Sequence, residues 1–187
     1  MIDFPKLRHR LAKLPGKKFA AKLYRTVLVQ DRDSILEIWP SQLHGWRFNP
    51  KGVFGALYLS EDPETCIREV FKHIPDPKVF LGRPRVLGMI EIHLQKCLDL
   101  TDEKVLAHLG VTEEIILSEG SKEAILLSRE ARKAGFEGII YRSSVNPSQK
   151  NVAFFKDAMH QDSSCKLLKT DTLSDKDLIR IVEKRRV

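Results

Sequence analysis

The chain has 187 residues, of which 42% are hydrophobic and 30% are charged, as in a globular domain with a substantial core. No apolar run reaches the length of a membrane span, and the N-terminus lacks a secretory apolar segment. The three cysteines form no CxxC pair and the six histidines show no metal-ligand spacing. We therefore expect a reducing, cytoplasmic setting, with no disulfide framework and no metal site.

The net charge of +7 is concentrated at the N-terminus. Residues 1–26 hold eight lysines and arginines against one acidic residue, and the remainder is neutral. This basic arm (about residues 1–21) is expected to form a solvated amphipathic helix with an apolar side made of Phe4, Leu7, Leu11 and Leu14. The alternative is that the arm binds nucleic acid, an acidic partner or a ligand phosphate.

Apolar runs punctuated by proline, glycine and helix-capping residues predict short strands mixed with helices. Strands are expected at residues 22–30, 55–60, 85–94 (with a second extended piece at 98–100), 138–141 and 151–156. Helices are expected at residues 62–74, 102–110, 121–135 and 174–186, with loop or short helical turns in 35–46 and a further turn or two at 112–117. Because no regular βαβ rhythm occurs, we predict one compact α+β domain over 1–187, in which helices flank small mixed or antiparallel sheets.

Three side chains of different chemistry occur at even intervals in the first half of the chain. Arg47 lies in a loop, Tyr58 in the strand that follows and Glu69 on the next helix. A cation, an aromatic face and a carboxylate suit a ligand with phosphates, a flat ring and a developing positive charge, such as NAD. Each also has an ordinary interpretation. The helical wheel places Glu69 off the apolar side of its helix, as an exposed residue that pairs with His73.

A polar loop at residues 142–150 offers further candidate contacts. Ser143 and Ser144 follow a buried-looking strand, where a hydroxyl could cap a turn or contact a ligand. The chain has no Gly-x-Ser-x-Gly elbow, P-loop or Rossmann glycine motif. These absences disfavour a serine hydrolase and the commonest nucleotide-binding folds.

Five blocks, taken in order, resemble the RES domain family, the toxins of Xre–RES toxin–antitoxin systems. They are LYR (23–25), GWRFNPKG (45–52), ALYLSEDPETCIREV (56–70), GFEGIIYRSSVNPSQKN (135–151) and VAFF (152–155), which together place the core at about residues 20–160. The family's Gly-Arg-Trp-Asn core corresponds to residues 46–49. The family often has an aspartate at the position of Glu137 and a proline at that of Arg142.

The resemblance implies an ADP-ribosyltransferase-like fold and a set of site residues. The implied catalytic residues are Glu69, Arg47, Tyr58 and Ser143, and the implied NAD-contacting residues are Arg25, Arg47, Tyr58, Ser143 and Asn151. The two arginines would clamp the pyrophosphate, the tyrosine would stack on the nicotinamide or ribose, and the glutamate would stabilise the ribosyl cation. Ser143, or its neighbour Ser144, would hydrogen-bond the nicotinamide ribose or amide. Asn151 is expected to fix its own loop.

The implied function is cleavage of the nicotinamide–ribose bond of NAD by a growth-arresting toxin, with water or phosphate as the acceptor. A protein ADP-ribosyltransferase of the same fold and an inactive nucleotide-binding domain are alternatives. A regulator that binds nucleic acid through the basic arm is a rival from another class, with steeply salt-dependent binding. The implied partners are NAD, a cognate Xre-type antitoxin whose terminal segment plugs the NAD cleft, and a protein acceptor in the transferase case. Nucleic acid would be contacted only through the antitoxin, and no membrane is involved.

Overall fold

The computed structural model describes residues 4–72, 76, 82–118 and 120–183. The strands are β1 (Lys17–Leu28), β2 (Leu57–Ser60), β3 (Arg85–Asp99), β4 (Gly138–Arg142), β5 (Lys150–Phe154) and β6 (Ser164–Leu173). The helices are α1 (Phe4–Lys13), α2 (Trp39–His44), α3 (Pro63–Phe71), α4 (Glu103–Leu109), α5 (Glu113–Leu117), α6 (Lys122–Lys133) and α7 (Asp175–Glu183), with 3₁₀ turns η1 (Val29–Ser34) and η3 (Lys156–Ala158). None of the helices in these ranges is long and apolar enough to cross a membrane.

The six strands form one sheet in the order β1-β2-β5-β4-β3-β6, and β1 also pairs with β3. The first five strands therefore close on themselves. The closure is uneven, because β1 pairs with β3 along its whole length but with β2 only at Tyr24 and Ser60. Only β3 and β4 run parallel among these pairings. The predicted α+β class is confirmed, with one mixed sheet in place of several small ones.

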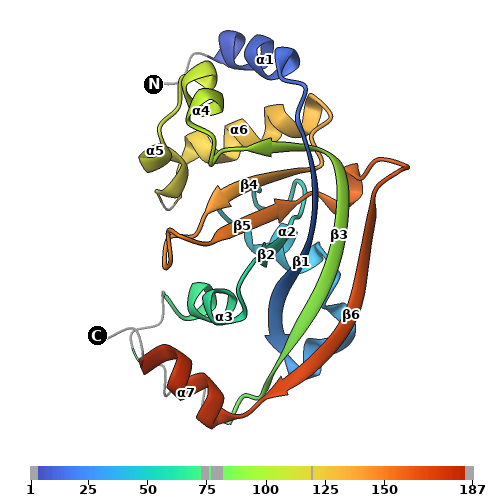
Figure 1. The fold of residues 1–187 in the computed structure, drawn as a ribbon, viewed down its shortest axis with the longest axis vertical. Coiled ribbons are helices and arrows are strands. Elements are labelled where there is room, and N and C mark those ends of the chain that lie inside the picture. The colour runs from blue at the N-terminus through green and yellow to red at the C-terminus, as the bar shows by residue number, and fades with distance from the viewer. Residues whose placement is uncertain (1–3, 73–75, 77–81, 119, 184–187) are drawn as a thin grey trace.

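Two apolar clusters pack the two faces of the β2-β5-β4 segment. The inner one fills the closed part of the sheet and includes Leu23, Leu59, Ile90 and Phe154. The other cluster lies between the opposite face of this segment and four helices. These helices, α1, α4, α5 and α6, gather at one end of the molecule (Figure 1). At the other end α3 packs on α7, β1 and β2, with Ile67 and Phe71 in a third cluster.

The basic arm is an integral part of the domain. Leu7 and Leu11 are fully buried in the core, which confirms the predicted amphipathic helix at these positions, whereas the side chain of Phe4 lies outside the described residues. Arg8 pairs with Glu130 at 2.7 Å. Deleting residues 1–20 would thus remove core packing as well as charge.

Local capping signals begin the helices at the predicted residues. The carboxylates of Asp62 and Asp102 accept hydrogen bonds from the backbone N–H groups of Thr65 and Lys104, at 2.6 and 2.8 Å, and Ser121 caps α6 in the same way. The predicted ends of two helices, at residues 74 and 186, lie outside the described residues.

Three strands differ from the prediction. β1 begins at Lys17 rather than at residue 22, and the two predicted pieces of β3 form one continuous strand. β6 was not predicted at all. It lies at an edge of the sheet, pairs only with β3 and is largely solvated, so its sequence SCKLLKTDTL lacks the apolar alternation of a half-buried strand.

Candidate functional site

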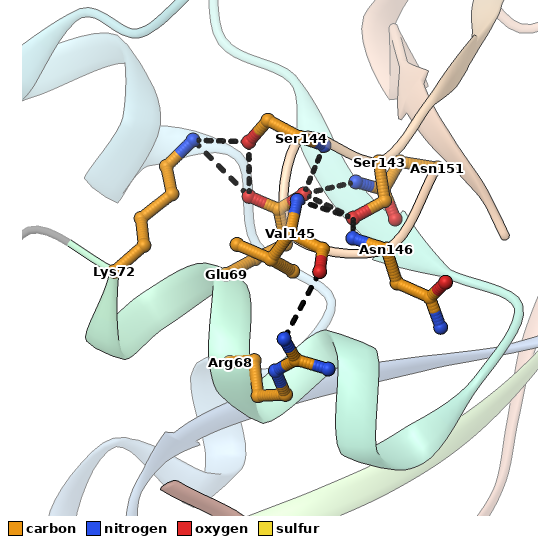
Figure 2. A network of polar contacts seen from close by, with 8 residues as sticks. All are labelled: Arg68, Glu69, Lys72, Ser143, Ser144, Val145, Asn146 and Asn151. Carbon is orange, nitrogen blue, oxygen red and sulfur yellow. Dashed lines mark hydrogen bonds and ion pairs between the residues drawn. The ribbon is translucent and has the colours of Figure 1, made fainter. Parts of the chain in front are cut away.

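Glu69 lies near the end of α3 and points across to the loop between β4 and β5 (Figure 2). Its side chain is 17% exposed. The ordinary interpretation of Glu69 as a solvated helix glutamate is therefore wrong, and its predicted partner His73 lies outside the described residues. The burial comes from the loop, which covers this side of the helix.

Five hydrogen bonds hold the Glu69 carboxylate. Its Oε1 accepts from Ser143 Oγ at 2.6 Å, Asn151 Nδ2 at 2.8 Å and the Ser144 backbone N–H at 3.1 Å. Its Oε2 accepts from Lys72 Nζ at 3.1 Å and Ser144 Oγ at 3.3 Å. Burial alone would raise the pKa of Glu69, but the Ser143 hydrogen bond, the Lys72 charge and the Asn151 hydrogen bond together hold this pKa below its ordinary value. The carboxylate is therefore ionised at neutral pH.

The loop from residue 143 to 149 is fastened to α3 by polar contacts. Ser143 is fully buried, and its Oγ accepts from the backbone N–H groups of Val145 and Asn146, each at 3.2 Å, while it donates to Glu69. Arg68 of α3 donates to the Val145 carbonyl at 3.0 Å (Figure 2). Ser143 thus links the loop to the glutamate, whereas Ser144 is exposed. A direct contact of Ser143 with ribose stays a prediction.

Asn151 comes to the same carboxylate from β5. It lies opposite Ser60 of β2 and Tyr141 of β4 in the sheet register, and it is 3% exposed. The expectation that Asn151 fixes its own loop is wrong, because its Nδ2 donates to Glu69 on α3. Sequence order could not bring these two residues together, since the contact depends on how α3 packs beside the sheet.

Arg47 lies in a tight turn closed by pairing of Trp46 with Asn49. Its guanidinium carbon is 5.7 Å from the centre of the Tyr141 ring, a cation–π contact. Its buried Nε has no hydrogen-bond partner among the residues that the structure describes. Buried donors are nearly always paired, so this atom is suited to an acceptor oxygen of a ligand.

Tyr141 is a site residue that the sequence analysis did not single out. It is buried on β4 between the two charged groups: burial raises the pKa of its hydroxyl, Arg47 lowers it and Glu69 raises it. The signal available in the sequence was an aromatic residue two positions before Ser143, in the block at residues 135–151. Its ring connects the arginine to the glutamate network.

Tyr58 holds the Arg47 turn in place. Its hydroxyl donates to Asn49 Oδ1 and accepts from the Phe48 backbone N–H, both at 2.9 Å. Burial raises the pKa of this hydroxyl well above its ordinary value, so it stays protonated. The predicted stacking on a ligand ring stays a prediction, because the observed contacts assign the hydroxyl to the turn.

Arg25 is engaged elsewhere. Its guanidinium donates to the backbone carbonyls of Ile35 and Glu37, each at 3.0 Å, and burial lowers its pKa to about 10. No contact described here joins Arg25 to Arg47 or Glu69, and its role at a pyrophosphate stays a prediction. Within the described ranges, no three His, Cys, Asp or Glu side chains are grouped so as to hold a metal ion.

Comparisons with known proteins show the family and the fold of the chain. The family model described as "RES domain" matches residues 22–172. A probable NAD(+) phosphorylase of Mycobacterium tuberculosis is 33% identical over 115 residues, which are 60% of this chain and 54% of that protein, so the chain spans about half the length of this curated relative. A chain in the crystal structure of the M. tuberculosis MbcT–MbcA toxin–antitoxin complex superposes with a TM-score of 0.79 at 17% identity, covering 95% of this chain and 97% of that one. The superposition establishes a shared fold.

Proposed function

The chain belongs to the RES domain family, and on this premise we propose that it cleaves the nicotinamide–ribose bond of NAD as the toxin of a toxin–antitoxin pair. The observation that carries the proposal is the Glu69 carboxylate, which five donors hold in its ionised form. The name of the curated relative favours phosphate over water as the acceptor.

The chemistry of the bond matches this carboxylate. When the ribose C1′–nitrogen bond breaks, the bonding electrons neutralise the nicotinamide ring, and positive charge develops on the ribose. The leaving group needs no general acid, so the enzyme contributes negative charge and positioning. Glu69 supplies the charge. Its Oε2, which has fewer protein donors than Oε1, is the atom that a ribose hydroxyl would reach.

Arg47 would bind the pyrophosphate of NAD. Its buried Nε lacks an acceptor among the described residues, and its guanidinium lies over the Tyr141 ring, 5.7 Å from the ring centre. A planar guanidinium matches phosphate oxygens with two parallel hydrogen bonds, which lysine cannot do. Tyr58 supports the same turn, so a positioning role for Tyr58 is part of the proposal.

A separate antitoxin protein is the partner that we propose, since a structural neighbour of this chain is found in a toxin–antitoxin complex. The apolar side of α1 is packed into the domain core, so this part of the basic arm belongs to the folded domain and is not a separate nucleic-acid-binding segment. A salt titration of DNA or RNA binding, measured alongside NAD cleavage, separates the two functions.

The direct test is incubation of the purified protein with NAD, with nicotinamide measured by chromatography and the ribosyl product by mass. We expect stoichiometric release of nicotinamide from NAD. The reduced form, NADH, would bind but remain intact, because its leaving group would carry the electron pair as an anion. Absence of nicotinamide release from NAD would reject the proposal, and equal cleavage of NADH would reject the mechanism.

Ser143→Ala should lower the rate of NAD cleavage by about tenfold to a hundredfold, because small misplacement of a catalytic group costs rate on that scale. The substitution removes the 2.6 Å hydrogen bond that orients Glu69. It also raises the pKa of Glu69, so the acidic limb of the pH–rate profile should move to higher pH.

The matched control for this variant is Ser128→Ala on α6. Ser128 is also fully buried, and its hydroxyl donates to the Ile125 carbonyl at 2.7 Å, far from the glutamate in the fold. This control should leave both the rate and the pH profile unchanged. A rate loss in Ser143→Ala without a shift of the acidic limb would indicate damage to the loop alone.

A further inference from the structure

Lys72 and Ser144 help to hold the catalytic carboxylate in its ionised form, and they also contact each other. Lys72 Nζ lies 3.1 Å from Glu69 Oε2 and 2.9 Å from Ser144 Oγ (Figure 2). We propose that Lys72 and the Ser144 hydroxyl form the acceptor subsite, which binds inorganic phosphate for attack on the ribose C1′. The inference rests on the proposed function and assigns the residues that select its acceptor.

The state of Glu69 favours an acceptor that is already an anion. A water molecule needs a base to take its proton as it attacks. Glu69 is a poor base, since five donors occupy its two oxygens and hold its pKa below the ordinary value. Phosphate dianion carries its own nucleophilic oxygen and requires no such base.

A dianion beside a carboxylate requires a cation between them. Among the described residues, Lys72 is the cation in contact with Glu69, and its ammonium also donates to the hydroxyl of Ser144, an exposed residue. Two nearby arginines also contact protein groups, although the buried Nε of Arg68 has no hydrogen-bond partner among the described residues. Arg68 donates to the Val145 carbonyl, and Arg142 pairs with Glu113 at 3.2 Å.

Ser144 suits the same subsite because, unlike Ser143, it is accessible to a ligand from solvent. Ser143 is fully buried and serves the loop, whereas Ser144 is exposed. The Ser144 hydroxyl already lies within hydrogen-bond distance of both the Lys72 ammonium and Glu69 Oε2. A phosphate oxygen would accept from the ammonium, and the Ser144 hydroxyl would turn its proton from Glu69 Oε2 to the same anion.

The step balances without another reactant. An oxygen of HPO₄²⁻ forms a bond to C1′ as the C1′–nitrogen bond breaks, and the bonding electron pair leaves with nicotinamide, which becomes neutral. The product is ADP-ribose carrying a phosphate monoester on C1′. The monoester proton that came with the phosphate is then exchanged with solvent. Lys72 keeps its protons throughout.

The test is a comparison of Lys72→Gln with wild type in steady-state assays with varied phosphate and varied NAD. We expect the KM for phosphate to rise at least about tenfold, the loss that follows removal of one charge-assisted hydrogen bond. The KM for NAD should rise less than the KM for phosphate, since Arg47 would still hold the pyrophosphate of NAD. The mass of the product should shift from the phosphorylated sugar toward the hydrolysed one. Lys72→Arg, which keeps the charge, should restore most phosphate use.

Lys133→Gln is the matched control. Lys133 makes the same i,i+3 ion pair, with Glu130 at 3.0 Å on α6, so the control removes an equivalent pair away from the site. An unchanged KM for phosphate in Lys72→Gln overturns the inference. So does an equal fall in kcat with both acceptors, which would mean that Lys72 only orients Glu69.

Failure of the proposed NAD cleavage and failure of the phosphate subsite give different results. If wild-type protein releases no nicotinamide with or without phosphate, the proposed function fails, and the variants are not needed to show it. If Lys72→Gln does not fold, Ser144→Ala decides instead, because an exposed serine can be replaced without loss of packing. A KM for phosphate that Ser144→Ala leaves unchanged would then overturn the subsite.

Discussion

Glu69→Gln should abolish most NAD cleavage while the protein stays folded. The substitution keeps the shape of the side chain but removes the negative charge that would stabilise the ribosyl cation. Loss of one electrostatic contact of this kind costs about 2.7–4 kcal/mol of transition-state stabilisation, or about 10²–10³ in kcat. The fold should survive, because α3 is held independently by its Asp62 cap and by its packing on α7. The measurements are kcat/KM from nicotinamide release and the melting temperature.

Glu130→Gln is the control for this result. Glu130 is a buried glutamate on α6 that, like Glu69, pairs with a lysine three residues later, and it also pairs with Arg8. We expect Glu130→Gln to leave NAD cleavage unchanged, whatever it does to stability. If Glu69→Gln retained wild-type cleavage, the proposed role of the carboxylate would be rejected. If Glu69→Gln melted at far lower temperature than the control, Glu69 would be chiefly a structural residue.

The parts of the fold that the sequence predicts are those that depend on local chemistry. Asp62, Asp102 and Ser121 cap helices through hydrogen bonds to N–H groups two or three residues away, so the pattern is complete within a few residues. β6 depends instead on pairing with β3, more than seventy residues earlier. Its residues are mostly solvated, and without that partner nothing in the segment distinguishes a strand from a loop.

In the candidate site too, local features could be predicted from the sequence, and contacts between distant segments could not. The helical wheel places Glu69 off the apolar face of α3, and this is true of the helix alone. What buries Glu69 is the loop that begins at Ser143, whose hydroxyl lies 74 positions away in the sequence. The family resemblance predicted that Glu69, Ser143 and Asn151 share one site, because the site residues of a family are those that meet in its folded members. It did not indicate that Ser143 and Asn151 hold the glutamate, or that Tyr141 lies under Arg47, since those are contacts between packed elements.

Glu137→Leu should destabilise the protein more than any other substitution considered for this chain. Glu137 is fully buried just before β4. Its Oε2 accepts from the backbone N–H groups of Gln95 and Lys96, at 2.7 and 2.8 Å, and its Oε1 accepts from the His160 N–H at 2.9 Å. These bonds tie β3, β4 and the segment after β5 together at one point.

Removing this carboxylate leaves the part-buried N–H groups of Lys96 and His160 without an acceptor, whereas the Gln95 N–H keeps only its longer hydrogen bond to Ser163 Oγ, at 3.2 Å. Each unsatisfied donor costs about 1–3 kcal/mol, so we expect the free energy of unfolding to fall by about 3–5 kcal/mol. Denaturant unfolding followed by circular dichroism measures this change. Asp99→Asn is a suitable comparison, since Asp99 is also largely buried but has Lys17 and Thr101 as partners near the surface, and its loss should be smaller.

The contribution of Glu137 to the free energy of unfolding should also depend on pH. Burial would raise the pKa of Glu137, but the Ser163 hydroxyl and the three backbone donors outweigh it and hold the pKa below its ordinary value. A group whose pKa is lower in the folded state stabilises the fold above its unfolded pKa, and that stability is lost as the pH falls through the folded pKa. The difference in unfolding free energy between wild type and Glu137→Gln should therefore be full near neutral pH and shrink below about pH 4. A difference that did not change with pH would show that shape, and not charge, is what the three donors require.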